Sequence, residues 1–370
     1  MSLRNHAPRL ARIAAVVAAL VAPLGPAFAE GWPERTTPEF DALLAAGRAE
    51  GEVVLFGDPL LAEEFSRAFE RDSGIRVVFM SGTQNDKKIR FLRETEAQAA
   101  TFDAFFGAYE ALDPAQAGHL LPVAPSLLLP EITEGAYWRE GRLHFLDTAA
   151  TYVPVPVQYV SGLMLINSDI VDVAELRSWQ DLLAPEFKGR IISHDPRVTG
   201  AGEGLVIYLA HVLGLEYFQQ LFLGQEVRMT TDYRQITDAV ARGTAAVGLG
   251  AHFRDIVRYQ REGLQNLRVV VPEDAHGYLV GGGAALAIPS SAPHPNAAMV
   301  FANWYLSQHG QKAYTDIYAL PSDRVDVVAG PWPEFIVPEP GETYLNQFTA
   351  VWVGEIVAQL RPKFLAMLPR

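Results

Sequence analysis

The sequence predicts a two-lobed α/β protein whose chain leaves one lobe, builds a second and then returns to the first. Short apolar stretches alternate with stretches of helical periodicity on both sides of residue 152, a pattern typical of largely parallel sheets covered by helices. Two segments are expected to be extended crossings: 152–157, where prolines disfavour helix at the residue before them, and 277–283, which contains three consecutive glycines. Two crossings between lobes indicate a hinge with a central cleft.

The first lobe is expected to comprise residues 30–152 together with 277–319. Its apolar segments predict strands, and its amphipathic segments, several of them ended by glycine, predict helices. The expected strands are 53–57, 75–80, 102–106 and 284–289, and the expected helices are 38–50, 60–72, 86–99 and 295–307.

The second lobe is expected to comprise residues 153–276 together with 320–370. Phe348, Trp352, Ile356 and Leu360 recur every four positions, which predicts a C-terminal helix over 344–360 packed on this lobe. The expected strands are 159–167, 189–193, 245–250 and 267–271, and the other expected helices are 179–183, 203–223 and 233–243.

The first 29 residues have the features of a secretory signal peptide. Three arginines precede an apolar run over 13–24, and small residues at Ala27 and Ala29 predict cleavage after Ala29. The apolar run is too short to span a bilayer comfortably, so we expect export to the periplasm rather than a membrane anchor.

Composition excludes several classes of function. The chain has no cysteine, so it has no acylated thiol, disulfide or thiolate metal site. The net charge of −13 argues against nucleic acid binding. We expect a monomer that binds a small molecule and needs no cofactor.

The loop over 195–204 is the sharpest candidate for ligand binding. Small residues before an apolar helix expose backbone N–H groups with the helix dipole behind them, which favours an anion. Thr199 and Gly200 lie in this loop, and Arg197 could hold a carboxylate or phosphonate through two parallel hydrogen bonds. The alternative is a glycine-rich turn in which Thr199 caps the helix and Arg197 is a surface charge.

Loops after the strands of a parallel sheet are further candidates, because ligands bind at that edge in open α/β folds. Ser81, Gly82 and Thr83 follow the second strand, and Tyr109 follows the third. Each could equally form an ordinary turn or cover the end of the sheet. Tyr159 lies near the first crossing and could stack on a ligand or pack in the hinge.

The order and spacing of several segments resemble one family. The stretches GEVVLFGDPLLAEEFSRAFERDSGIRVVFMSG (51–82), YVSGLMLINSDIV (159–171), SWQDLLAPEFKGRIISHDPRVTGAG (178–202), AVARGTAAVGLGAHF (239–253) and HPNAAMVFANWYLSQHGQKAY (294–314) are similar to periplasmic iron(III)-binding proteins and related solute-binding proteins of ABC importers. The resemblance implies the type II periplasmic-binding-protein fold, a permease of an ABC transporter in the inner membrane as partner, and a ligand site between the lobes.

The sequence departs from this family at the metal site. Iron-binding members carry adjacent tyrosines after the strand that ends here at Gly250, whereas this chain has Ala251-His252-Phe253-Arg254. Iron(III) prefers oxygen ligands, and the phenolate oxygens of the tyrosine pair are absent here, so we do not expect this chain to bind the family's metal. His252 and Arg254 become candidate ligand contacts, with a structural hydrogen bond as the alternative for His252. Tyr233 is a weaker candidate, beside Asp232 as the expected helix cap.

These observations predict a transport receptor that captures a small solute by closing its lobes, with an organic anion favoured. Three alternatives remain. The first is an iron(III) receptor. The second is a periplasmic enzyme on the same lobes, although the sequence has no His-Glu-x-x-His motif and no G-x-S-x-G motif. The third is a receptor that presents its ligand to a signalling partner.

Overall fold

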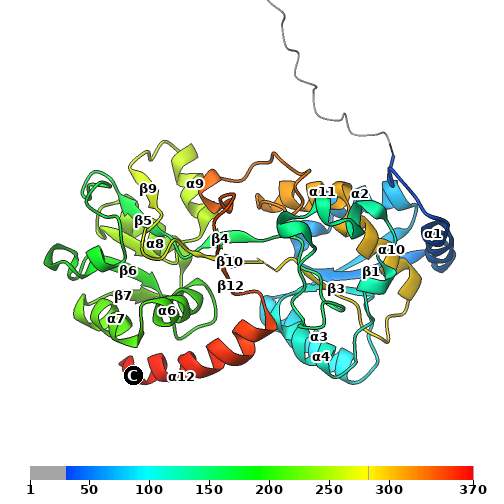
Figure 1. Cartoon of the computed structure of the whole chain (residues 1–370), viewed down its shortest axis with the longest axis horizontal. Helices are drawn as coiled ribbons and strands as arrows, with labels where there is room; N and C mark the ends of the chain where they lie inside the picture. Colours follow the sequence, from blue (N-terminus) through cyan, green and yellow to red (C-terminus); the bar gives the residue numbers. More distant parts are fainter. Residues whose placement is uncertain (1–30, 282, 370) are drawn as a thin grey trace, which may run out of the picture.

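The computed structural model describes residues 31–281 and 283–369, so the predicted signal peptide lies outside the described residues. Two α/β lobes lie side by side and are joined by strands in the middle of the molecule, as Figure 1 shows. The predicted fold class is confirmed. Within the described ranges, no helix combines the length and hydropathy needed to cross a membrane.

Lobe one is built around the sheet β11-β3-β1-β2, in which β1 pairs in parallel with β2 and β3, and β11 is antiparallel to β3. Its aromatic core packs Phe65 against Trp304 with ring centroids 5.0 Å apart. Its elements are α1 (Pro38–Glu50), β1 (Glu52–Gly57), α2 (Glu64–Ser73), β2 (Arg76–Ser81), α3 (Gln84–Glu96), β3 (Ala104–Gly107), α4 (Leu112–Gln116), α5 (Pro130–Thr133), β11 (Ala285–Ala287), α10 (Pro295–Leu306) and α11 (Gln308–Tyr318).

Lobe two is built around the sheet β7-β6-β8-β5-β9, with parallel pairing of β6 to β7 and β8. Trp179 is fully buried in its core, and α12 lies along this lobe (Figure 1). Its elements are β5 (Met164–Asn167), β6 (Ile191–His194), α6 (Ala201–Val212), α7 (Leu215–Gln219), β7 (Arg228–Thr230), α8 (Tyr233–Ala241), β8 (Val247–Leu249), α9 (Phe253–Arg261), β9 (Leu267–Val270) and α12 (Ala358–Met367).

A third sheet connects the lobes. Strand β10 (Tyr278–Val280) lies between β4 (Tyr159–Ser161), to which it is antiparallel, and β12 (Leu345–Asn346), to which it is parallel. Gly162 follows β4 with φ +79°, and a Cβ atom there would lie 2.4 Å from the ring of Tyr278. Only glycine therefore allows the chain to turn into lobe two so close to β10.

The hydrophobic cores depart from the expected lobe boundaries at two places. Val153, Val155 and Val157 pack with lobe-one residues, so the first crossing into lobe two comes at β4, after residue 158. Leu320 and Ile336 also belong to the lobe-one core, although the prediction assigned everything from Leu320 to lobe two. Contacts between segments distant in the sequence decide both boundaries, and local periodicity does not report such contacts.

Three predicted elements are interrupted. The strand expected over 159–167 breaks at Gly162 into β4 and β5, and the helix expected over 203–223 breaks at Gly214, whose φ is +92°. The helix expected over 344–360 begins only after Thr349, whose hydroxyl accepts a hydrogen bond from the Trp352 N–H at 3.1 Å. Leu345 and Asn346 form β12 instead, because they pair with β10.

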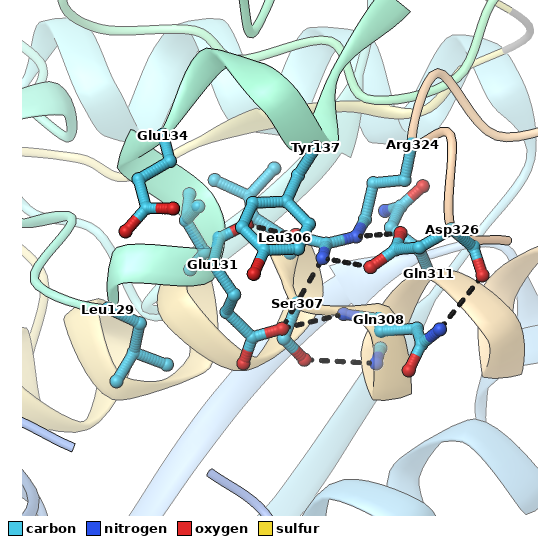
Figure 2. A network of polar contacts seen from close by, with 12 residues as sticks. Leu129, Glu131, Glu134, Tyr137, Leu306, Ser307, Gln308, Gln311, Arg324 and Asp326 are labelled. Atoms are coloured by element: carbon cyan, nitrogen blue, oxygen red, sulfur yellow. Dashed lines mark hydrogen bonds and ion pairs between the residues drawn. The ribbon is translucent and has the colours of Figure 1, made fainter. Parts of the chain in front are cut away.

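A buried arginine holds the segment after residue 320 onto lobe one (Figure 2). The Arg324 side chain is fully buried and donates Nε and Nη2 to the two carboxylate oxygens of Asp326, at 2.9 and 2.7 Å. Its Nη1 donates to the carbonyls of Glu131 and Leu306 at 2.8 and 3.0 Å. The guanidinium also lies over the ring of Tyr137, 5.3 Å from its centroid. A guanidinium can be buried here because nearly every N–H has an acceptor.

We expect Arg324→Ala to lower the free energy of unfolding by about 3–5 kcal/mol, because it leaves Asp326 and two carbonyls without their donor. Urea unfolding of purified protein measures this loss. Arg71→Ala is the matched control, since Arg71 pairs with Asp72 through a side chain that is 71% exposed, and it should cost under about 1 kcal/mol. Equal losses in the two variants would contradict the structural role of Arg324.

Candidate functional site

A cavity of about 820 Å³ lies where the two lobes meet the connecting strands. Pockets that hold small molecules are typically of this size, mostly apolar, with a few polar groups that orient the ligand. Lobe one contributes Lys88 and Tyr109, and lobe two contributes Thr199, Gly200, Glu203, Tyr233, His252 and Phe253. The connecting strands contribute Tyr159, Ser161, Tyr278 and Val280, and the segment after β12 contributes Phe348 and Trp352.

The predicted loop before α6 reaches the cavity through Thr199 and Gly200. Gly200 has φ +149°, and a Cβ atom there would lie 2.4 Å from the hydroxyl of Tyr233. This hydroxyl accepts a hydrogen bond from the Ala201 N–H at 3.3 Å. Nδ1 of His194 accepts one from the Gly202 N–H at 3.2 Å. Side chains therefore already satisfy two of the N–H groups that were expected to face an anion.

Arg197 lies outside the cavity lining. Its guanidinium binds Asp195, with Nε 2.9 Å from Oδ1 and Nη2 2.7 Å from Oδ2, and Nη1 donates to the Pro369 carbonyl at 3.3 Å. These hydrogen bonds lower the pKa of Asp195 below its ordinary value. The structure thus gives Arg197 an internal carboxylate in place of the ligand contact predicted from the sequence.

Ser81, Gly82 and Thr83 are exposed at the end of β2 and are absent from the cavity lining. Thr83 caps α3, since its Oγ1 accepts from the Asp86 N–H at 3.2 Å. The neighbouring Lys87 is only 7% exposed, and burial lowers its pKa. This turn therefore matches the structural alternative, and sequence patterns gave no sign that Lys87 would be buried beside it.

Tyr109 and Tyr159 both line the cavity. The Tyr109 hydroxyl donates to the Gln347 carbonyl at 3.0 Å, and Nε2 of Gln347 donates to the Gly204 carbonyl at 2.9 Å, so these residues link lobe one through the connecting segment to α6. Burial raises the pKa of Tyr159 to about 12, which keeps its hydroxyl protonated at neutral pH.

His252 lines the cavity, whereas Arg254 does not. Nδ1 of His252 caps α9 by accepting from the Arg254 N–H at 3.3 Å. Burial, with a smaller effect of the Arg254 charge, lowers the pKa of His252 to about 4. The ring is therefore neutral at physiological pH and carries its proton on Nε2. The Arg254 side chain instead donates Nε to the Tyr318 carbonyl at 3.3 Å, and its guanidinium carbon lies 5.1 Å from the centroid of the Tyr318 ring. These contacts tie α9 to lobe one.

Several lining residues were not predicted from the sequence. Glu203, on the first turn of α6, forms an ion pair with Arg361 of α12, and both line the cavity. Tyr278 and Trp352 reach it from the connecting strand and from the segment before α12. Their positions depend on contacts between distant segments, so no local motif marks them. Asp232 caps α8 as predicted, accepting from the Arg234 N–H at 2.9 Å.

Comparison with known proteins decides the family. Residues 64–334, most of the chain, match the bacterial extracellular solute-binding proteins. The chain belongs to this family. It is 28% identical over 295 residues to an uncharacterized protein of Haemophilus influenzae, an alignment covering 73% of this chain and 79% of the relative.

Solved structures share the fold of this solute-binding protein. The ferric binding protein from Campylobacter jejuni superposes with a TM-score of 0.64 at 16% identity, covering 86% of this chain and all of the other. The periplasmic binding protein AfuA from Actinobacillus pleuropneumoniae, solved with fructose-6-phosphate, superposes with a TM-score of 0.56 at 17% identity, covering 85% of this chain and 99% of the other. Proteins of this fold therefore hold chemically different ligands, and the fold alone does not specify the solute.

The lowered pKa of His252 predicts an acid dependence of stability. Between its folded value of about 4 and the ordinary 6.5, the unfolded chain binds more protons, so stability is lost as the pH falls through this window. His252→Asn keeps a side-chain oxygen that can cap α9 and removes the titrating ring. The difference in Tm between about pH 7 and about pH 4.5 should therefore shrink in this variant.

His211→Asn makes the same substitution at an exposed ring outside the cavity lining and is the matched control. The inferred protonation of His252 would be wrong if His252→Asn lost as much Tm on acidification as the native protein.

Proposed function

We propose that the protein is the periplasmic solute-binding component of an ABC importer. It captures a small organic solute between its lobes and delivers it to the permease. The single observation that supports this best is that one cavity is lined by both lobes and by the strands that connect them. A ligand that contacts both lobes binds the closed form better than the open form, and this difference in affinity shifts the equilibrium toward closure.

The proposal includes export by the predicted signal peptide and two lobes that move about the sheet β12-β10-β4. Lobe boundaries in this proposal follow the hydrophobic cores, with residues 320–336 moving with lobe one. Cell fractionation should recover the mature chain, beginning near Glu30, in the periplasm.

An organic solute is favoured over iron(III). Within the described residues, no group of three or more His, Asp or Glu side chains is arranged to hold a metal ion. Burial raises the pKa of Tyr159 to about 12 and the pKa of Tyr278 above its ordinary value, which opposes formation of the phenolates that iron(III) would need. Two cationic side chains, Lys88 and Arg361, line the cavity, and Arg361 is paired with Glu203. Among the described residues Lys88 has no ion-pair partner, so a solute with a single negative charge fits best.

The proposed receptor function can be tested by a thermal-shift screen of the purified protein against organic carboxylates, phosphonates, polyamines and iron(III). A ligand at a hundred times its Kd should stabilise the protein by about 2.7 kcal/mol. Small-angle X-ray scattering should then show a smaller radius of gyration, and mass spectrometry should recover the ligand unaltered. Chemical conversion of the ligand would favour an enzyme, and binding without compaction would contradict capture by closure.

Two glycine variants locate the site. Gly200→Ala would place a Cβ atom 2.4 Å from the Tyr233 hydroxyl and should abolish the ligand-induced shift by displacing that side chain. Gly214→Ala introduces comparable backbone strain at φ +92°, but its Cβ atom would meet nothing within 4 Å, so the shift should remain. An intact shift in Gly200→Ala would place the ligand elsewhere.

A further inference from the structure

Five rings form a continuous series along one side of the cavity, and we call this series the aromatic wall. The members are Tyr159, Phe253, His252, Tyr233 and His194. Neighbouring centroids are 5.7, 5.0, 5.9 and 4.2 Å apart in that order. The first four line the cavity, and His194 stacks on Tyr233 from behind with an angle of 5° between the planes.

The aromatic wall is assembled from elements that are distant in the sequence. Tyr159 begins β4, His252 and Phe253 begin α9, Tyr233 begins α8, and His194 ends β6. Loops at the ends of strands bring these positions together at one edge of lobe two. The planes of neighbouring rings along the cavity meet at 62°, 24° and 68°. The wall is therefore angled rather than flat, and a ligand ring can pack on it through stacked and edge-to-face contacts with its members.

Two hydrogen-bond donors on the wall lack protein acceptors in the part of the chain that the structure describes. Because Nδ1 of His252 accepts from a backbone N–H, the neutral ring carries its proton on Nε2. The Tyr233 hydroxyl accepts from the Ala201 N–H, so its own proton remains available to a ligand. Thr199 also lines the cavity and adds a third donor, its hydroxyl. Neutral donors of this kind suit an oxygen acceptor on the ligand.

Full charges are sparse around these donors. Glu203 and Arg361 neutralise one another in an ion pair, and the exposed Lys88 approaches from lobe one. A solute with several negative charges would lose its hydration without enough cations to replace it, whereas one carboxylate needs only the neutral donors and Lys88.

We propose that the solute is an aromatic or heteroaromatic monocarboxylate. Its ring lies against the aromatic wall, and its carboxylate accepts hydrogen bonds from Nε2 of His252 and the Tyr233 hydroxyl. This inference rests on the proposed receptor function and specifies the class of its substrate. It also implies selection against citrate, inorganic phosphate and aliphatic acids, which offer no ring to the wall.

The test compares carboxylates that differ in the ring. Benzoate, nicotinate and indole-3-acetate are the aromatic probes, and cyclohexanecarboxylate, acetate, succinate and citrate are the comparison set. We expect at least one aromatic probe to bind at least about tenfold more tightly than every comparison compound, by thermal shift and by quenching of the protein's tryptophan fluorescence, to which Trp352 contributes from the cavity lining. Tighter binding of a comparison compound would contradict the proposal that the solute carries an aromatic ring, while leaving the receptor role intact. No binding by any compound, in this set or in the wider screen, counts against both.

Variants then assign the contacts. Tyr159→Phe keeps the ring and should retain affinity for the best aromatic probe, whereas Tyr159→Leu should lose about tenfold or more. Tyr152→Leu is the matched control, because Tyr152 is similarly half-buried in lobe one but lies outside the cavity. Circular dichroism checks that each variant folds.

His252→Asn provides a second, independent test that preserves the cap of α9. Loss of the ring and of Nε2–H should weaken the aromatic probe by about tenfold or more, and should weaken acetate less, because acetate loses only the hydrogen bond from Nε2. Native affinity in both Tyr159→Leu and His252→Asn would show that the wall does not hold the ligand.

Discussion

The antiparallel pairing of β4 with β10 is the contact on which the rest of this structure depends. These strands carry the chain into lobe two and back, so their hydrogen bonds keep the two cores adjacent without merging them. Gly162 and Gly277 lie where the crossings meet lobe two, with φ of +79° and +108°. A Cβ atom at either residue would lie within 3 Å of the opposite crossing. The pairing therefore requires glycine at both positions, and it places Tyr159 and Tyr278 at the cavity.

The arginines near the cavity on lobe two are bound by groups of the protein itself, and this bears on which solute the cavity fits. Arg197 binds Asp195, Arg254 binds the end of α11, and Arg361 binds Glu203. What remains at lobe two is a set of neutral donors on aromatic rings. Because removing several charges from water is costly without paired partners, such a surface supports the proposed solute of low charge, although the fold is shared with proteins solved with iron or a sugar phosphate.

The sequence pointed to some of the cavity-lining positions for three different reasons. Thr199 and Gly200 were chosen as small residues before a helix, Tyr109 as a residue after a strand, and His252 because the resemblance places it where relatives carry metal ligands; all four line the cavity. Arg197 was chosen for its chemistry, and a local contact excludes it: the Asp195 carboxylate accepts from both the backbone and the side chain of Arg197. Thr83 caps its own helix in a similar local way.

The sequence by itself determined the alternation of strands and helices, the approximate places where the chain crosses between lobes and the Asp232 cap of α8, because these depend on contacts within a few residues and on the periodicity of apolar side chains. Only the tertiary structure decided that Tyr278, Gln347 and Arg361 meet α6, that Leu320 and Ile336 pack on lobe one, and that five rings from four loops and strand ends form one wall. Such contacts join segments separated by long stretches of chain, and pairing at that separation leaves no periodic signal in the sequence.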